Sequence, residues 1–394
     1  MRRDESVSVA DAWSGFHRLT PEQRLARVAE HTKLSAGDRA SLTAASALPR
    51  ELAAQFVENA VGSFPLPLAF AVHAVVDGTP VVVPMAVEES SVVAAASHGA
   101  KLAAAGGGFR TKVDDPVTIG QVELRSVRDV AAAKRTVGRQ RKAWVADLNK
   151  SIASMVARGG GVRSIEARAV GKGRLVLHLL VDTRDAMGAN VVNTLCERLA
   201  PVAAEALGAK VGLRILSNLA DHRLATATCR VPAKALGGRE AVRAIVAANR
   251  FALDDPYRAA THNKGILNGI DPVLVATGND WRAVEAGAHA YAARAGQYRA
   301  LTTYKADAKG DLVASLTLPM AVGTVGGVTR LHPTAKACLA VLGNPDAKRL
   351  AAIAVSIGLA QNLAALKALS GEGIQKGHMA LHATNLALAK RKTA

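Results

Sequence analysis

Residues 261–280 read THNKGILNGIDPVLVATGND and place Lys264 between polar residues and glycine. The apolar, β-branched run at 272–277 that follows predicts a short buried strand. A glycine-containing polar turn comes next and includes Asp280. Strand ends followed by such turns hold the functional side chains of many α/β proteins. Lys264 and Asp280 would meet only if the chain between them folds back, as a structural ion pair or as a catalytic pair.

The composition predicts a large aliphatic core. A chain of 394 residues is long enough for two or three domains. Hydrophobic residues make up 49% of it but aromatic residues only 3%, so Ala, Val and Leu must fill the core. Neither a long apolar span nor a signal peptide is evident, which predicts a cytoplasmic protein without a membrane segment. The three cysteines, Cys196, Cys229 and Cys338, lack metal-ligand spacing and are expected to be reduced.

The formal net charge of +18 raises nucleic-acid binding as an alternative function. The basic residues are dispersed, apart from clusters at 134–142 and 390–392. No aromatic side chains alternate with the clusters to stack on bases, and no nucleic-acid-binding motif is present. A polyphosphate ligand would be attracted by the same positive charge, so nucleic acid is not the favoured partner.

The first 108 residues predict short helices, a hairpin and one Ala-rich helix. Residues 20–22 (Thr-Pro-Glu) are typical of a helix start. Residues 71–84 predict a hairpin that turns at Asp77 and Gly78. Glu88 and Glu89 precede the Ala-rich helix and would be structural acids if they lay in its first turn. A catalytic glutamate there would need a neighbouring carboxylate or burial to raise its pKa.

The segment 109–215 has a different character. A basic helix is predicted at about 128–157, strands at 163–170 and 175–181, and a helix after 185–190, which read DAMGAN. A strand, a glycine-containing turn and a helix N-terminus can hold a pyrophosphate on free N–H groups. The spacing is not the GxGxxG fingerprint, so the pattern alone is weak.

The C-terminal part alternates strands and helices and ends in a glycine-rich segment. Helices are predicted at 239–250, 283–294, 333–343 and 346–369, strands at 224–231 and 317–321, and a glycine-rich turn at 323–327. Gly371, Gly373 and Gly377 are typical of a hinge. His378 and His382 are spaced like zinc ligands, but the glutamate of HExxH is missing, so no metal is predicted.

Several segments together resemble the class II (bacterial) 3-hydroxy-3-methylglutaryl-CoA (HMG-CoA) reductases, over essentially the whole chain. They are ENAVG at 58–62, the Glu88-Glu89 region, DAMGAN, the opening stretch and GHMALH at 377–382. The resemblance implies an α+β fold with a large, mostly helical substrate-binding and dimerisation domain at 1–108 and 216–373. It further implies an inserted small ferredoxin-like, non-Rossmann cofactor domain at 109–215 and a short C-terminal flap at 374–394.

The implied reaction is the NAD(P)H-dependent interconversion of HMG-CoA with mevalonate and CoA, in either direction. Lys264 would stabilise the oxyanion, Glu89 would donate protons while coupled to Asp280, and His378 would protonate the departing thiolate. The family motifs place the remaining site residues on this chain: Arg258, Ser91 and Asn268 for substrate; Asp185, Met187, Gly188, Asn190, Gly323 and Gly326 for cofactor.

The resemblance slightly favours NADH over NADPH. The acid that would bind the adenosine 2′-hydroxyl is not evident, since Ser151 and Ile152 stand in that region, and the nearby Lys150 and Arg158 favour NADPH instead. The family also implies a homodimer, or an oligomer of dimers, with active sites at subunit junctions. Relatives usually continue for some tens of residues after His378, so a weakly active or inactive flap-truncated homologue is an alternative.

Overall fold

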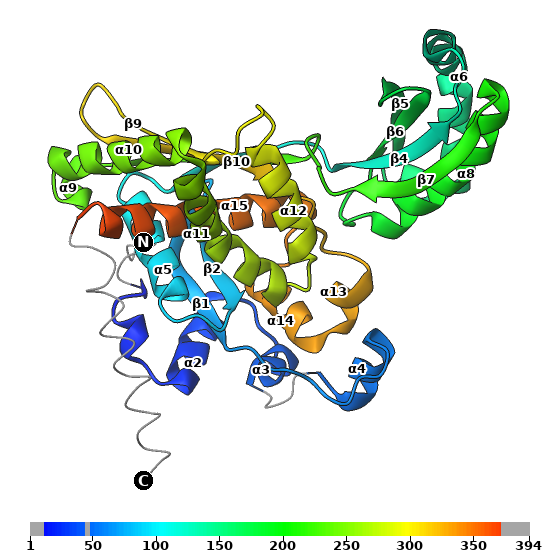
Figure 1. Cartoon of the computed structure of the whole chain (residues 1–394). Helices are drawn as coiled ribbons and strands as arrows, with labels where there is room; N and C mark the ends of the chain where they lie inside the picture. The colour runs from blue at the N-terminus through cyan, green and yellow to red at the C-terminus, as the bar shows by residue number, and fades with distance from the viewer. Residues whose placement is uncertain (1–11, 44–47, 372–394) are drawn as a thin grey trace, which may run out of the picture.

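The computed structural model describes residues 12–43 and 48–371, and the larger part of the fold is built on a six-stranded sheet (Figure 1). The strand order is β2-β1-β3-β8-β10-β9, and all neighbours pair antiparallel except β1 and β3. The bounds are β1 Leu68–Val76, β2 Thr79–Ala86, β3 Phe109–Val113, β8 Leu224–Val231, β9 Thr302–Ala306 and β10 Leu312–Pro319. The predicted hairpin is confirmed as β1 and β2, which turn at Asp77 and Gly78.

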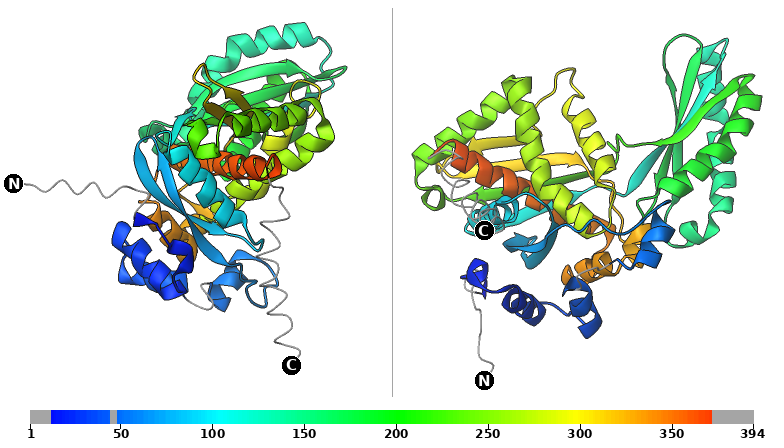
Figure 2. Two further views of the ribbon diagram at one scale, coloured as in Figure 1. Left: turned by 90° about the vertical axis from the view of Figure 1, so that its left-hand side faces the viewer. Right: turned by 60° about the horizontal axis from the view of Figure 1, so that its bottom comes forward.

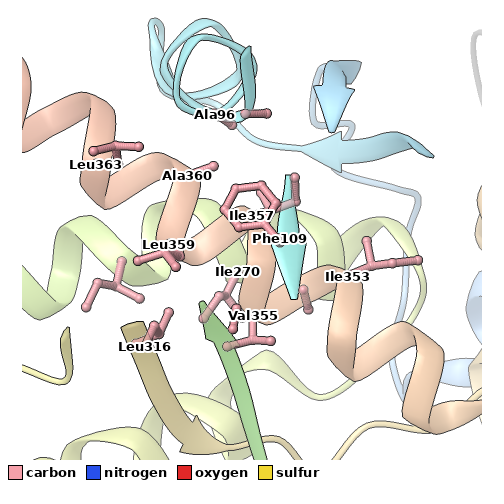
Figure 3. Close-up of a cluster of buried hydrophobic side chains, with 14 of the residues drawn as sticks. Ala96, Phe109, Ile270, Leu316, Ile353, Val355, Ile357, Leu359, Ala360 and Leu363 are labelled. Carbon is pink, nitrogen blue, oxygen red and sulfur yellow. The ribbon is translucent and has the colours of Figure 1, made fainter. Parts of the chain in front are cut away.

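Helix α15 (Ala347–Leu369) forms the centre of the core. It is buried without interruption over 350–364 and packs against α5 (Val92–Ala104), α11 (Pro256–Ala276) and the sheet. Figure 3 shows Ile357 of α15 beside Phe109 of β3, in a cluster that also contains Ile353 and Val355. An apolar surface all round a helix is typical of such a buried position. The helix is long and apolar enough to cross a membrane, but 89% of its most apolar window is buried in the fold.

Two glycines let neighbouring helices approach α15 closely. A Cβ atom on Gly99 of α5 would lie 1.9 Å from the carbonyl oxygen of Ala360, and one on Gly269 of α11 would lie 2.7 Å from that of Ile357. No side chain fits at such distances. Small residues and aliphatic side chains therefore replace the missing aromatics, as the composition predicts.

The strand predicted at 272–277 is wrong, because residues 272–276 form the last turn of helix α11 and Thr277 is its C-cap. The helix starts at Asp255, whose carboxylate accepts a hydrogen bond from the backbone N–H of Arg258, with Pro256 at the first position. Pro272 lies inside it. Burial between α15 and its neighbours outweighs the low helix propensity of proline and the β-branched valines.

Four further strands form a separate antiparallel sheet with order β5-β6-β4-β7. The elements follow one another as β4 Val117–Arg125, α6 Val130–Ser151, α7 Ala153–Ala157, β5 Gly161–Ala169, β6 Arg174–Asp182, α8 Ala189–Leu207 and β7 Lys210–Ser217. This is a β-α-β-β-α-β arrangement with its own hydrophobic core. Figures 1 and 2 show it standing beside the larger part.

One boundary differs from the sequence-based prediction. Strand β3 lies in the large sheet between β1 and β8, so the smaller unit starts at Val117 instead of residue 109. The mixed α and β architecture itself is confirmed, and so is the basic helix, which appears as α6 and α7. Cys196, Cys229 and Cys338 are buried free thiols, and burial raises the pKa of each to about 12.

The remaining helices surround these two sheets. Apolar residues of η1, α2 and α3 form a small core with β1 and β2, whereas α4 stands apart from this hairpin (Figure 1). Their bounds are η1 Phe16–Arg18, α2 Pro21–His31, α3 Ala36–Thr43, α4 Arg50–Phe56, α9 Ala233–Leu236, α10 Arg239–Asp254, α12 Trp281–Ala292, α13 Gly327–Leu331 and α14 Pro333–Val341. The helix start predicted at 20–22 is confirmed, because Thr20 caps α2 through a capping box with Gln23.

Candidate active site

A cavity of about 1080 Å³ lies between α5, α10, α11 and the C-terminal half of α15. On its wall the Nζ atom of Lys264 is 3.0 Å from the Oε2 atom of Glu89. The side chains are 60% and 42% exposed, so the pair faces the open cavity and is accessible to a ligand. The structure thus joins two predicted catalytic residues that lie 175 positions apart in the chain.

Glu89 is held in the connection between β2 and α5, not in the first turn of the helix. Helix α5 begins at Val92, its first turn contains no acid, and Ser91 before it has φ +73°. The structural interpretation of Glu88 and Glu89 as first-turn acids is therefore wrong. The left-handed turn at Ser91 directs the chain so that Glu89 and Ser91 both line the cavity.

The predicted substrate-binding residues line the same cavity. Arg258, Lys264 and Asn268 all come from α11, at spacings that bring them to one side of the helix. Partial burial lowers the pKa of Arg258, which stays cationic at neutral pH. Together with Glu89 and Ser91, these side chains give the cavity two cations, a carboxylate and neutral hydrogen-bonding groups.

Asp280 does not lie at this cavity within the same chain. It caps α12, where its carboxylate accepts a hydrogen bond from the N–H of Ala283 and lies 3.8 Å from Arg282. About 18 Å of helix separate Lys264 from Ala276, the last residue of α11. The intervening chain is a helix and does not fold back. Asp280 and Lys264 of the same chain therefore do not form the pair that the sequence analysis predicts.

The predicted cofactor segments meet each other at a second place. The backbone oxygen of Asp185 accepts hydrogen bonds from the N–H groups of Thr324 and Val325, at 2.8 and 3.3 Å. A Cβ on Gly323 would lie 2.4 Å from the nitrogen of Met187. The turn at 185–190 therefore packs directly on the glycine-rich turn at 323–327, which also holds Gly326.

A cavity of about 380 Å³ adjoins these turns. Its lining includes Asp185 and the basic residues Arg158, Arg184 and Lys348. Helix α8 begins just after Gly188 (φ +96°), and Asn190 lies in its first turn, where N–H groups are free to bind an anion. These features fit the anionic dinucleotide that the motif predicts.

His378 lies outside the described residues, as does His382. Among residues 12–43 and 48–371, no group of three His, Cys, Asp or Glu side chains is arranged to hold a metal ion.

His262 is a site residue to which the sequence assigned no role, although it stands two positions before Lys264. It is 1% exposed, lines the larger cavity, and its Nε2 is 2.6 Å from the hydroxyl of Thr302. Burial, and to a lesser extent the charge of Arg258, lowers its pKa to about 3. His262 is therefore neutral and helps to fix the wall of the cavity.

We expect His262 to make the fold sensitive to moderate acid. The unfolded chain binds a proton below its ordinary pKa of 6.5, whereas the folded chain does so only near pH 3, so the free energy of unfolding falls as the pH drops through this window. His262→Gln should flatten the dependence of Tm on pH between 6.5 and 4. The exposed His289→Gln is the control, and a native slope in His262→Gln would contradict the prediction.

Comparison with known proteins identifies the family of this chain. The family model described as hydroxymethylglutaryl-coenzyme A reductase matches residues 20–383. The chain belongs to the hydroxymethylglutaryl-coenzyme A reductase family. It is 48% identical over 378 residues to the 3-hydroxy-3-methylglutaryl-coenzyme A reductase of Archaeoglobus fulgidus, covering 95% of this chain and 86% of that protein. A probable reductase of Borreliella burgdorferi is 34% identical over 337 residues, covering 84% and 77%.

Solved reductase structures agree with this assignment. The enzyme of Streptococcus pneumoniae superposes with a TM-score of 0.90 at 44% identity, covering 96% of this chain and 91% of that one. A structure of the class II enzyme from the same organism, bound to NADPH in open conformations, gives a TM-score of 0.88 at 43% identity, covering 91% and 99%. The chain is thus a class II HMG-CoA reductase by family, and an oxidoreductase.

Proposed function

We propose that this reductase interconverts HMG-CoA with mevalonate and CoA in the larger cavity. The observation that carries the proposal is the 3.0 Å contact between Lys264 and Glu89 on a cavity wall that Arg258 also lines. In the reductive direction, two hydrides and two protons convert the thioester into a primary alcohol and release CoA. The nicotinamide cofactor supplies the hydrides, and the protein must stabilise negative charge and move protons.

Each of these residues has a chemical task in that reaction. Negative charge develops on the carbonyl oxygen when a hydride reaches the thioester carbon, and the ammonium group of Lys264 would stabilise it. Glu89, in contact with Lys264, would deliver a proton to that oxygen. The guanidinium of Arg258 suits the free carboxylate of the substrate.

A second subunit would supply the missing carboxylate. Because α11 holds Asp280 away from Lys264 in its own chain, the predicted coupling requires Asp280 of a partner copy. The segment before β1 carries exposed apolar residues: Val61 within the ENAVG region is 87% exposed, and Phe64 shortly after it is 91% exposed. Apolar side chains grouped on a surface are typical of an interface, so we place the subunit contact there.

The two units would have separate roles in the reaction. The six-stranded part, to which β3 belongs, would bind substrate and form the dimer, and the unit from Val117 to Ser217 would bind the cofactor. Residues 374–394, outside the described residues, would act as the flap. Leu369 at the end of α15 and the next two residues, Ser370 and Gly371, line the larger cavity, so the chain that follows starts beside the proposed site.

We propose that the enzyme prefers NADPH to NADH as its cofactor. This reverses the slight preference for NADH that was drawn from the resemblance. Arg158, Arg184 and Lys348 around the smaller cavity would favour an additional phosphate. We expect kcat/KM to be higher with NADPH, and Arg158→Met to lower it by about tenfold with NADPH but little with NADH. The exposed Arg168→Met of the same unit is the control. Equal effects on both cofactors would count against this assignment.

His378 would protonate the CoA thiolate after the first reduction. We expect His378→Ala to slow reduction of the thioester more than reduction of free mevaldehyde, because the aldehyde releases no thiol. Steady-state rates on both substrates measure this difference. Equal losses would show that His378 acts in a step that both reactions share.

One assay tests the function itself. The absorbance at 340 nm should fall when HMG-CoA is added with NADPH or NADH, and rise when mevalonate and CoA are added with the oxidised cofactor. An inactive homologue would give no change although it binds both ligands. The nucleic-acid alternative instead requires DNA binding that weakens steeply with salt.

A further inference from the structure

Arg223 is a buried arginine at the junction of the two units, just before β8, and is 3% exposed. Its Nη2 atom donates to the backbone oxygen of Val322. Its Nη1 atom lies within 3.2–3.5 Å of four oxygens of the smaller unit: the hydroxyls of Thr118 and Thr183 and the carbonyls of Ala186 and Met187. One guanidinium group therefore joins the turn before α8 to the segment after β10.

All of these acceptors are neutral. The nearest carboxylates, Asp182 and Asp185, act on Arg223 only through space. Asp182 accepts hydrogen bonds from Arg163 and from the N–H of Arg184, and Asp185 accepts one from the N–H of Ala347. Burial lowers the pKa of Arg223 to about 10, so it remains protonated at neutral pH. A positive charge thus lies beneath the turn, hydrogen-bonded only to neutral oxygens, and it would add to the attraction of an anion bound there.

The contacts also set the direction of the turn. In a trans peptide the C=O and the following N–H point to opposite sides, and the described residues contain no cis peptide. Since Arg223 holds the carbonyls of Ala186 and Met187, the N–H groups of Met187 and Gly188 are directed away from it. The free N–H groups at the start of α8 follow directly.

The second cofactor segment is fixed by the same group. Val322, whose carbonyl accepts from Arg223, precedes Gly323. The N–H of Gly323 donates to the side chain of Asn279, at 2.8 Å, next to Asp280. Arg223 thereby holds the turns at 185–190 and 323–327 in one relative position.

We propose that Arg223 is the positioning residue for the dinucleotide's phosphates: it orients the N–H groups of the 185–190 turn and supplies the positive charge behind them. This inference rests on the proposed function, because it assigns a further residue to the same cofactor site. Arg223 does not touch the reacting atoms, so its effect should appear in cofactor binding and not in substrate binding.

The test compares Arg223→Met and Arg223→Lys with the native protein. Dissociation constants are measured for NADPH and NADH by fluorescence and for CoA by calorimetry, and Tm is measured alongside. We expect Arg223→Met to weaken dinucleotide binding by about tenfold or more, with CoA binding changed less than about twofold. Arg223→Lys keeps the charge but loses the fork of donors, so an intermediate loss is expected. Arg174→Met, which removes an exposed arginine of the same unit that pairs with Glu123, is the control and should bind the dinucleotide normally.

Unchanged dinucleotide binding in Arg223→Met, or equal losses for dinucleotide and CoA, would overturn the inference. If Arg223→Met does not fold, the test rests on Arg223→Lys. A folded Arg223→Lys protein that binds the dinucleotide with native affinity would overturn the inference. Failure of the native protein to bind either dinucleotide would instead refute the proposed function. The two failures are therefore distinguishable.

Discussion

Lys264→Ala is expected to lower kcat by about 100-fold to 1000-fold, with the chain folded and dimeric. Removing one preorganised donor to a developing oxyanion costs about 2.7–4 kcal/mol of transition-state stabilisation. The side chain of Lys264 is 60% exposed and pairs with Glu89, which is itself 42% exposed, so its removal leaves no buried charge behind within the described part of the chain. The rate of cofactor oxidation at saturating HMG-CoA measures the loss, and KM should change less.

The matched control is Arg250→Ala on the neighbouring helix α10. Arg250 also forms an exposed ion pair, with Asp254 at 2.6 Å, but neither residue lines the cavity. An exposed pair of this kind contributes little to stability, so the variant should resemble the native enzyme in both Tm and kcat. Near-native turnover in folded Lys264→Ala would refute the assignment of the catalytic pair.

Dimers that carry Lys264→Ala in one subunit and Asp280→Asn in the other are expected to keep about half of the native activity. In a closed twofold dimer, each site would combine Lys264 of one subunit with Asp280 of the other, so such a dimer contains one intact site. Each homodimeric variant should be strongly impaired. The mixed dimer is isolated with two different affinity tags, and its kcat is compared with that of native dimers.

The control carries both substitutions in one subunit beside a native partner. A site shared between subunits predicts near-complete loss here, because both sites are broken. A site within one subunit predicts the reverse: half activity in this control and almost none in the first mixed dimer. The helix between Lys264 and Asp280 favours the shared site, and the two dimers give opposite results under the two models.

Local patterns determined most of the elements before any tertiary contact is considered. The start of α2, the basic helix α6, the hairpin at Asp77 and the helix after DAMGAN follow from caps, turn residues and periodicity. These signals act over a few residues, so they can be recognised without knowledge of the tertiary structure. The family motifs likewise named Glu89 and Lys264 without showing how they meet.

Only the tertiary structure decided the rest, because the deciding contacts join distant segments. The run at 272–277 is helical since α11 is buried against α15, which no local propensity reveals. Packing of α5 beside α11 joins Glu89 to Lys264, while the helical chain of α11 between them keeps Asp280 away from Lys264. Arg223 is one arginine among many in the sequence, and it becomes distinctive only through five oxygens that three separate segments bring around it. Sequence determined which side chains are available, and burial and long-range packing decided which of them act together.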